Sequence, residues 1–246
     1  MAKAVGITTL VLSEPPSKTF KPKMDLPELS SYAGSGTAEF WEKFPVNSAV
    51  YRPSLIDHRK LFQLALAAGI NEQRTGKICQ GLQLGVDIGC EGGARQPTRS
   101  KNASSAYEYG RQVTDAVASW VTKGFVRGPV NLDQVPEEAK VNGIMCRPKP
   151  DGSVRIILNM SAPAGRSVND GIDISRFPAK MSSTTKWLAV LEKAGRGCYI
   201  MKIDWSDAYK HIPVRAEDLN LQWFEWLGKA FQELCLIFGT ASSVGL

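Results

Sequence analysis

The sequence has few of the residues that build metal centres and disulfide frameworks. Its 246 residues include only two histidines, and its five cysteines are scattered, with no C-x-x-C pair. Zinc sites are built from clustered cysteine and histidine ligands, so no zinc site is expected. Scattered cysteines in an odd number are typical of free thiols in a reducing compartment, and we expect an intracellular protein of the cytoplasm or nucleus.

Long apolar runs are missing as well. No stretch approaches the roughly 20 apolar residues of a membrane helix, so no membrane partner is expected. The apolar residues 4–12 are followed by Ser-Glu-Pro-Pro at 13–16, and the absence of a small-residue cleavage site argues against a secretory signal. The glycine-rich residues 85–93 lack the Gly-Lys-Ser/Thr ending of a phosphate-binding loop and predict a turn.

A moderate excess of positive charge is present. The chain has 30 lysines and arginines against 24 acidic residues, a net charge of +6. Such an excess favours polyanionic partners, although a basic protein without any such partner has the same total. The distribution is more informative, because residues 140–166 contain one acid, Asp151, and five basic residues: Lys140, Arg147, Lys149, Arg155 and Arg166.

Hydrophobic periodicity predicts helices in the first half of the chain. Ser54 and Asp57 resemble a capping box for a helix over residues 55–68. Residues 106–123 carry valines, alanine and Trp120 at helical spacing, and Trp120 is expected in the core. Later in the chain, Ser182 or Ser183 is expected to cap a helix that ends at Gly195.

Strands are predicted after residue 140. Asp151-Gly152 is a strong turn signal, and it predicts a hairpin of residues 142–149 with 153–159. A second hairpin is expected around Leu227-Gly228, and residues 198–204 have the composition of a buried strand. The predicted organisation is a flexible leader over residues 1–50, a helical segment over 51–139 and an α+β region over 140–246.

Three sequence blocks stand in a fixed order within the α+β region, and together they resemble the reverse transcriptases of retrotransposons, most closely those of the DIRS type. The blocks are Arg147-Pro-Lys149-Pro-Asp-Gly-Ser-Val-Arg155-Ile-Ile-Leu-Asn159, Asp204-Trp-Ser-Asp-Ala-Tyr209 and Leu236-Ile-Phe238-Gly239-Thr-Ala-Ser242-Ser243-Val244. The resemblance implies an α+β fold with the fingers and the first half of the palm of a polymerase domain over residues 140–246.

The resemblance assigns a catalytic metal site to the second block. Asp204 would be the first metal-binding carboxylate of the palm, and the backbone carbonyl of Trp205 would add a ligand. The implied cofactor is Mg²⁺ or Mn²⁺, because nucleotide addition is an in-line phosphoryl transfer that two metal ions promote. The alternative for Asp204 is a capping or surface acid before a turn.

The same resemblance assigns nucleotide contacts to the residues that follow. Tyr209 would pack under the sugar and exclude a 2′-hydroxyl by steric contact, which favours deoxynucleotides; the alternative is an ordinary core tyrosine. The backbone amides of Asp207 and Ala208 would face the triphosphate, as successive turn amides do with anions.

The first and third blocks supply the remaining contacts. Lys149 and Arg155 would hold the incoming triphosphate, Arg155 through two parallel hydrogen bonds and Lys149 as a point charge. Phe238 and Gly239 would pack against the nucleotide and template, with glycine permitting close backbone approach. The alternatives are a solvated hairpin tip for the two cations and a simple core position for Phe238.

The chain departs from the family pattern at several positions. Ile237 and Val244 stand where proline is common, and Asn159 and Ser161 stand where an acid and an arginine are common. No Tyr-x-Asp-Asp motif is present, so we expect this chain alone to be inactive. The predicted function is therefore an RNA-directed DNA polymerase fragment with a primer–template of RNA and DNA and deoxynucleoside triphosphates as partners. The alternative is a catalytically inactive retroelement product that only binds nucleic acid.

Overall fold

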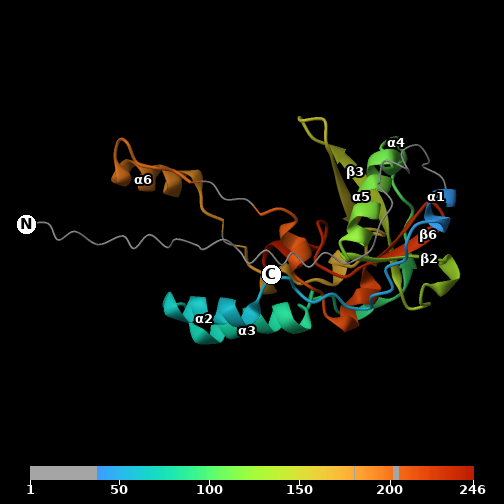
Figure 1. Cartoon of the computed structure of the whole chain (residues 1–246), viewed down its shortest axis with the longest axis horizontal. Helices are drawn as coiled ribbons and strands as arrows, with labels where there is room; N and C mark the ends of the chain where they lie inside the picture. The colour runs from blue at the N-terminus through green and yellow to red at the C-terminus, as the bar shows by residue number, and fades with distance from the viewer. Residues whose placement is uncertain (1–37, 180, 202–204) are drawn as a thin grey trace, which may run out of the picture. The chain divides into compact units, whose positions relative to one another are not determined.

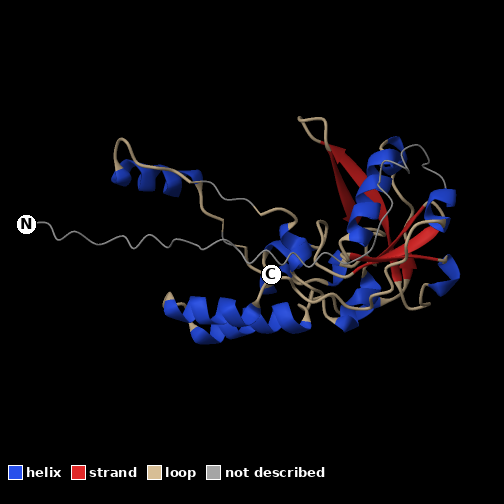
Figure 2. Cartoon of the chain, in the orientation of Figure 1, coloured by secondary structure: helices blue, strands red, loops and turns tan. Residues whose placement is uncertain are grey.

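A computed structural model of the chain describes residues 38–179, 181–201 and 205–246. All described residues belong to one compact unit, which lies within Gly34–Leu246. This unit combines helices with a mixed sheet (Figure 1, Figure 2), which confirms the predicted mixture of α and β structure.

The described strands form one mixed sheet with the order β1-β3-β5-β6-β2, and β4 pairs with β3 outside this path. β1 and β5 run parallel to β3, whereas the β3–β4, β5–β6 and β6–β2 pairs are antiparallel. The strands are β1 (Thr98–Arg99), β2 (Val126–Val130), β3 (Lys140–Pro148), β4 (Val154–Asn159), β5 (Trp223–Trp226) and β6 (Lys229–Glu233).

The long strand β3 has two different environments. Its first three residues pair with β1 and β5 in the buried centre of the sheet, whereas residues 143–148 pair only with β4. The hairpin turn at residues 149–153 is exposed. The β3–β4 hairpin therefore leaves the sheet and carries its tip into solvent, and the predicted hairpin is confirmed.

The helices are α1 (Ala38–Glu42), α2 (His58–Ala67), α3 (Glu72–Leu84), α4 (Ser104–Glu108), α5 (Gly110–Thr122) and α6 (Thr184–Ala194). Figure 1 shows α5 running alongside the sheet, where it contacts β2, while α4 contacts β3. The face of α5 that carries Val113, Val117 and Val121 is buried. α2 and α3 pack against each other as a helical hairpin.

Aromatic side chains connect the start of the described chain to the sheet. Trp41 is 1% exposed and meets the ring of Phe231 edge-on at 4.8 Å between centroids. Phe40 and Phe44 are buried beside it. The backbones of Asn47 and Gly128 also exchange two hydrogen bonds. Residues 38–47, which the sequence assigns to a leader, are thus packed on β2 and β6.

Several predicted elements need correction. The side chain that caps α2 is Asp57, which accepts hydrogen bonds from the amides of Arg59 and Lys60, and Ser54 instead donates to the carbonyl of His211. Residues 106–123 form two helices, because the chain turns at Tyr109. Residues 198–201 are exposed and form no strand, while 202–204 lie outside the described residues.

Two buried polar groups hold the loops around the sheet. The carboxylate of Asp218 is fully buried and accepts hydrogen bonds from the amide of Ile88 (3.1 Å), from Arg95 Nη1 (2.7 Å) and from Arg215 Nε (2.9 Å). Lys210 Nζ lies 2.5 Å from Glu233 Oε2, and Glu233 is 1% exposed. Both groups join segments that are far apart in the sequence.

None of the helices in the described ranges has the length and apolar character needed to cross a membrane.

Candidate functional site

The β3–β4 hairpin presents basic side chains on one face. Arg147 is the direct cross-strand partner of Arg155, and both side chains are exposed. Alternate residues of a strand point to the same face, so Lys149, one residue beyond the end of β3, continues the row of Arg147. The turn is fixed locally, because Asp151 accepts hydrogen bonds from the amide and hydroxyl of Ser153, which hold the pKa of its carboxyl below the usual value.

Arg155 meets an aromatic pair contributed by two other segments. Its guanidinium lies 5.4 Å from the centroid of the Phe238 ring, within the range of a cation–π contact. The ring of Phe238 meets that of Tyr209 edge-on, with centroids 4.7 Å apart. Phe238 is 53% exposed, so it is not the simple core residue of the alternative interpretation. The structure therefore brings one residue from each of the three sequence blocks into a single cluster, the Arg155–Phe238–Tyr209 cluster.

Gly239 allows the Phe238 loop to lie against β4. Its φ of +122° is in the region that favours glycine, and a Cβ there would lie 2.2 Å from the carbonyl oxygen of Leu158. No other residue fits this position without moving the loop. The close approach of backbone to backbone is what places Phe238 next to Arg155.

Asn169 also fixes the Phe238 loop, and the sequence gives no sign of this role. Its Nδ2 donates to the carbonyl of Gly239 at 2.7 Å and to Ser161 Oγ at 2.8 Å, and its Oδ1 accepts from the amide of Ala241 at 2.9 Å. These bonds tie the loop to the segment that follows β4. Asn169 lies 70 residues before Gly239 in the sequence, so no local pattern could reveal the pairing.

The segment that holds Tyr209 begins with an unusual backbone conformation. Asp207 has a φ of +55°, and the short 3-10 helix Ala208–His211 follows it. The carboxylate of Asp207 pairs with Lys123 Nζ at 3.1 Å, where both side chains are substantially exposed. Such an exposed pair contributes little to stability. The pair engages the Asp207 side chain, and the contact of its backbone amide with a triphosphate stays a prediction.

The described residues do not form a metal site. Asp204, the predicted metal ligand, lies outside the described residues, and the neighbouring Trp205 has a 65% exposed side chain. No cluster of three or more histidine, cysteine, aspartate or glutamate side chains that could hold a metal ion occurs in residues 38–179, 181–201 and 205–246.

Among the predicted site residues, Arg155, Tyr209, Phe238 and Gly239 come together, and Asp207 and Ala208 precede Tyr209 directly. Lys149 lies farther out, at the turn of the same hairpin. The prediction missed Asn169, and it also missed the placement of Arg147 directly opposite Arg155.

No family model matches the sequence, and no curated protein matches it. Solved structures of foamy virus protease–reverse transcriptase show some likeness. A selenomethionine-labelled CSH mutant of the prototype foamy virus protein is 17% identical, with a TM-score of 0.45 over 78% of this chain and 26% of that chain. The foamy viral protein in complex with dsDNA is 17% identical, with a TM-score of 0.40 over 81% of this chain and 41% of that chain.

The same viral protein in complex with an RNA/DNA hybrid is 16% identical, with a TM-score of 0.38 over 82% of this chain and 27% of that chain. This chain spans about a quarter to two fifths of the length of these proteins. At TM-scores below 0.5 the likeness carries no functional assignment, so the function is inferred from this chain's own residues.

Proposed function

We propose that this chain is the nucleotide-contacting part of an RNA-directed DNA polymerase. The observation that carries the proposal is the Arg155–Phe238–Tyr209 cluster, in which an exposed guanidinium and two aromatic rings come from segments up to 83 residues apart. A cation beside a flat, partly exposed ring suits a ligand that has both phosphates and a base.

Arg155 can stack on Phe238 and bind phosphate at the same time. A cation–π contact uses the face of the guanidinium, whereas the N–H donors lie in its plane and point outward. A triphosphate oxygen pair could therefore accept two parallel hydrogen bonds from Arg155 while Arg147 and Lys149 add positive charge on the same hairpin face. Arginine is better suited than lysine to this combined role.

Tyr209 and the Phe238 loop would set the position of the nucleoside. In the proposed arrangement Tyr209 packs under the sugar and disfavours a 2′-hydroxyl, and Phe238, which the packing of Gly239 against Leu158 holds in place, packs against the base. The amides of Asp207 and Ala208 would face the phosphates. Asp204 and the carbonyl of Trp205 stay the predicted ligands of Mg²⁺ or Mn²⁺, and a primer–template of RNA and DNA stays the predicted partner.

The nucleotide contact can be measured without catalysis. Binding of a fluorescently labelled deoxynucleoside triphosphate is followed by anisotropy for the wild type and for Arg155→Ala, with Arg155→Lys as a charge-conserving variant. We expect Arg155→Ala to weaken binding about ten-fold or more, because two charge-assisted hydrogen bonds are lost. Arg155→Lys should recover only part of the affinity, because it restores the charge but not the paired geometry.

Arg111→Ala is the matched control. Arg111 is an exposed arginine on α5 whose distance to Asp115 is 4.0 Å, and it lies outside the proposed site. Its removal lowers the net charge by the same amount as Arg155→Ala does. The affinity for the nucleotide should stay within about two-fold of the wild-type value. Equal losses in Arg155→Ala and Arg111→Ala would mean that only overall charge matters, and the proposed nucleotide site would be abandoned.

A further inference from the structure

The α2–α3 hairpin carries an excess of positive charge. Four exposed cations lie on it, and none of them forms an ion pair with any described residue. Between residues 58 and 84 the sequence contains a single acid, Glu72. The four cations are Arg59, Lys60, Arg74 and Lys77. A surface of this kind attracts polyanions.

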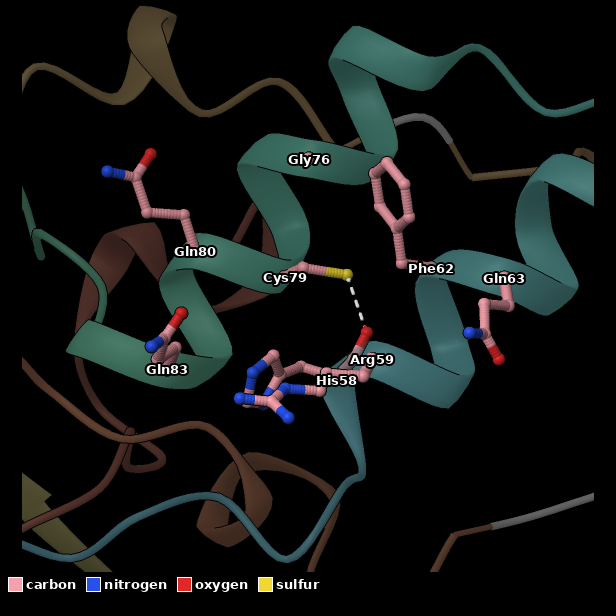
Figure 3. A pocket seen from close by; sticks show the side chains of 8 residues that line it. All are labelled: His58, Arg59, Phe62, Gln63, Gly76, Cys79, Gln80 and Gln83. Atoms are coloured by element: carbon pink, nitrogen blue, oxygen red, sulfur yellow. Dashed lines mark hydrogen bonds between the residues drawn. The ribbon is translucent and has the colours of Figure 1, made fainter.

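A cavity of about 530 Å³ lies between the two helices. Figure 3 shows the side chains that border it, with Arg59 beside His58 at one end and the ring of Phe62 beside Gly76 at the other. Gly76 packs against this ring, since a Cβ there would be in van der Waals contact with it at 4.0 Å. Three glutamines also line the cavity, and each amide offers both donors and acceptors: Gln63, Gln80 and Gln83.

A second cavity, of about 380 Å³, adjoins the first, because Gln80 lines both. It repeats the combination of a ring with a cation: Phe177 lies 5.7 Å from the guanidinium of Arg176, and Lys77 stands on the same lining. The acids nearby are engaged, since Asp87 pairs with Arg215 at 3.0 Å and Glu91 pairs with Arg176. The two cavities thus share Gln80, and each has an aromatic ring and a cation that forms no ion pair with a described residue on its lining: Phe62 with Arg59, and Phe177 with Lys77.

We propose that these two cavities bind single-stranded nucleic acid. Successive bases would stack on Phe62 and Phe177, the backbone phosphates would lie near Arg59 and Lys77, and the glutamine amides would hydrogen-bond to base edges. Stacking rings alternating with cations are the general means by which proteins hold single strands without sequence preference. The site shares no residue with the Arg155–Phe238–Tyr209 cluster and does not depend on it.

The test measures anisotropy of a fluorescein-labelled oligothymidylate of about 12 nucleotides, which suits a site of this kind. The double variant Arg59→Ala/Lys77→Ala should bind about ten-fold more weakly at about 0.1 M salt, with the slope of log affinity against log salt reduced by about 1.4, which is 0.7 for each lost phosphate contact. Phe62→Leu keeps an apolar side chain but removes the ring, and it should weaken binding about five-fold or more.

Two control variants separate this site from general charge and from the proposed nucleotide site. Arg111→Ala/Lys193→Ala removes two exposed cations elsewhere and should bind as the wild type does. Lys149→Ala/Arg155→Ala reports on the hairpin of the proposed polymerase site, so a loss confined to that variant would overturn the α2–α3 site and leave the polymerase proposal standing. A loss of oligothymidylate binding confined to Arg59→Ala/Lys77→Ala would support the α2–α3 site alone.

Inorganic polyphosphate distinguishes a nucleic-acid site from a simple anion site, because it has charge but no bases. We expect Phe62→Leu to leave polyphosphate binding unchanged while it weakens oligothymidylate binding. No measurable oligothymidylate binding by the wild type, or no effect of Phe62→Leu on it, contradicts the proposal. Circular dichroism and thermal melting of each variant confirm that the chain stays folded.

Discussion

Replacing Asp218 with alanine is expected to lower the free energy of unfolding by about 3 kcal/mol. The carboxylate is fully buried, and it bonds to two arginines and to the amide of Ile88. Alanine would leave that buried amide without its acceptor, would leave Arg95 without its acidic partner, and would leave Arg215 paired with Asp87 alone. The measurement is the urea concentration at the midpoint of unfolding, compared with that of the wild type. The slope of the unfolding free energy against urea concentration should be the same in both proteins.

Asp115→Ala is the control for this prediction. The side chain of Asp115 is 65% exposed, and it lies 4.0 Å from Arg111 on the same helix. Its removal should change the free energy of unfolding by no more than about 0.5 kcal/mol. If Asp218→Ala unfolds at the same urea concentration as this control, Asp218 does not anchor the loops around the sheet.

Lys210→Met should destabilise the protein at neutral pH by about 3 kcal/mol, because it leaves the charge of Glu233 buried and unpaired in the core. Methionine preserves most of the side-chain volume, but it removes the cation–π contact in which Lys210 Nζ lies 4.5 Å from the centroid of the Trp120 ring. The loss therefore reports mainly on the unpaired carboxylate, because a cation–π contact contributes only about 0.5–2 kcal/mol. Lys123→Met, which removes an exposed pair with Asp207, should cost less than about 1 kcal/mol.

The deficit of Lys210→Met should shrink in acid. Burial raises the pKa of Glu233 above its usual value of 4.5, and the Lys210 ammonium opposes this rise. Without Lys210 the folded-state pKa rises further, so between pH 4.5 and that higher pKa the folded protein binds more protons than the unfolded chain. Stability is then lost as pH rises through this range and regained as pH falls from 7 toward 5. A deficit that is constant over this range would contradict the buried, unpaired charge.

Local signals predicted the elements whose stability is local. The Asp151-Gly152 turn placed the β3–β4 hairpin, Leu227-Gly228 placed the β5–β6 hairpin, and Ser183 caps α6 with its side chain. In each case a few neighbouring residues fix the backbone through turn or cap geometry.

Elements that depend on distant contacts were not predicted. α3 is rich in polar residues and has only Thr75, Cys79 and Leu82 buried, so its periodicity is weak in the sequence. β2 owes its strand conformation to pairing with β6, more than 100 residues later. The apolar residues 198–201 illustrate the reverse case, since their composition suggests a strand but the structure gives them no partner strand.

In the candidate site, too, the residues could be predicted from the sequence, whereas the contacts between them could not. Sequence blocks identified Arg155, Tyr209 and Phe238, because side-chain type and order are visible in the chain. Their contact depends on the fit of Gly239 against Leu158 and on the hydrogen bonds of Asn169 to the Phe238 loop, which only the folded backbone reveals.

Photocrosslinking with an azido-substituted deoxyadenosine triphosphate tests the central claim most directly. Mass spectrometry of the digested protein locates the attached base. The proposed site predicts attachment at Tyr209 or Phe238, suppressed by excess unlabelled deoxynucleotide and strongly reduced in Arg155→Ala. Attachment confined to other segments, or equal attachment in Arg155→Ala, would show that this cluster is not where the chain holds a nucleotide.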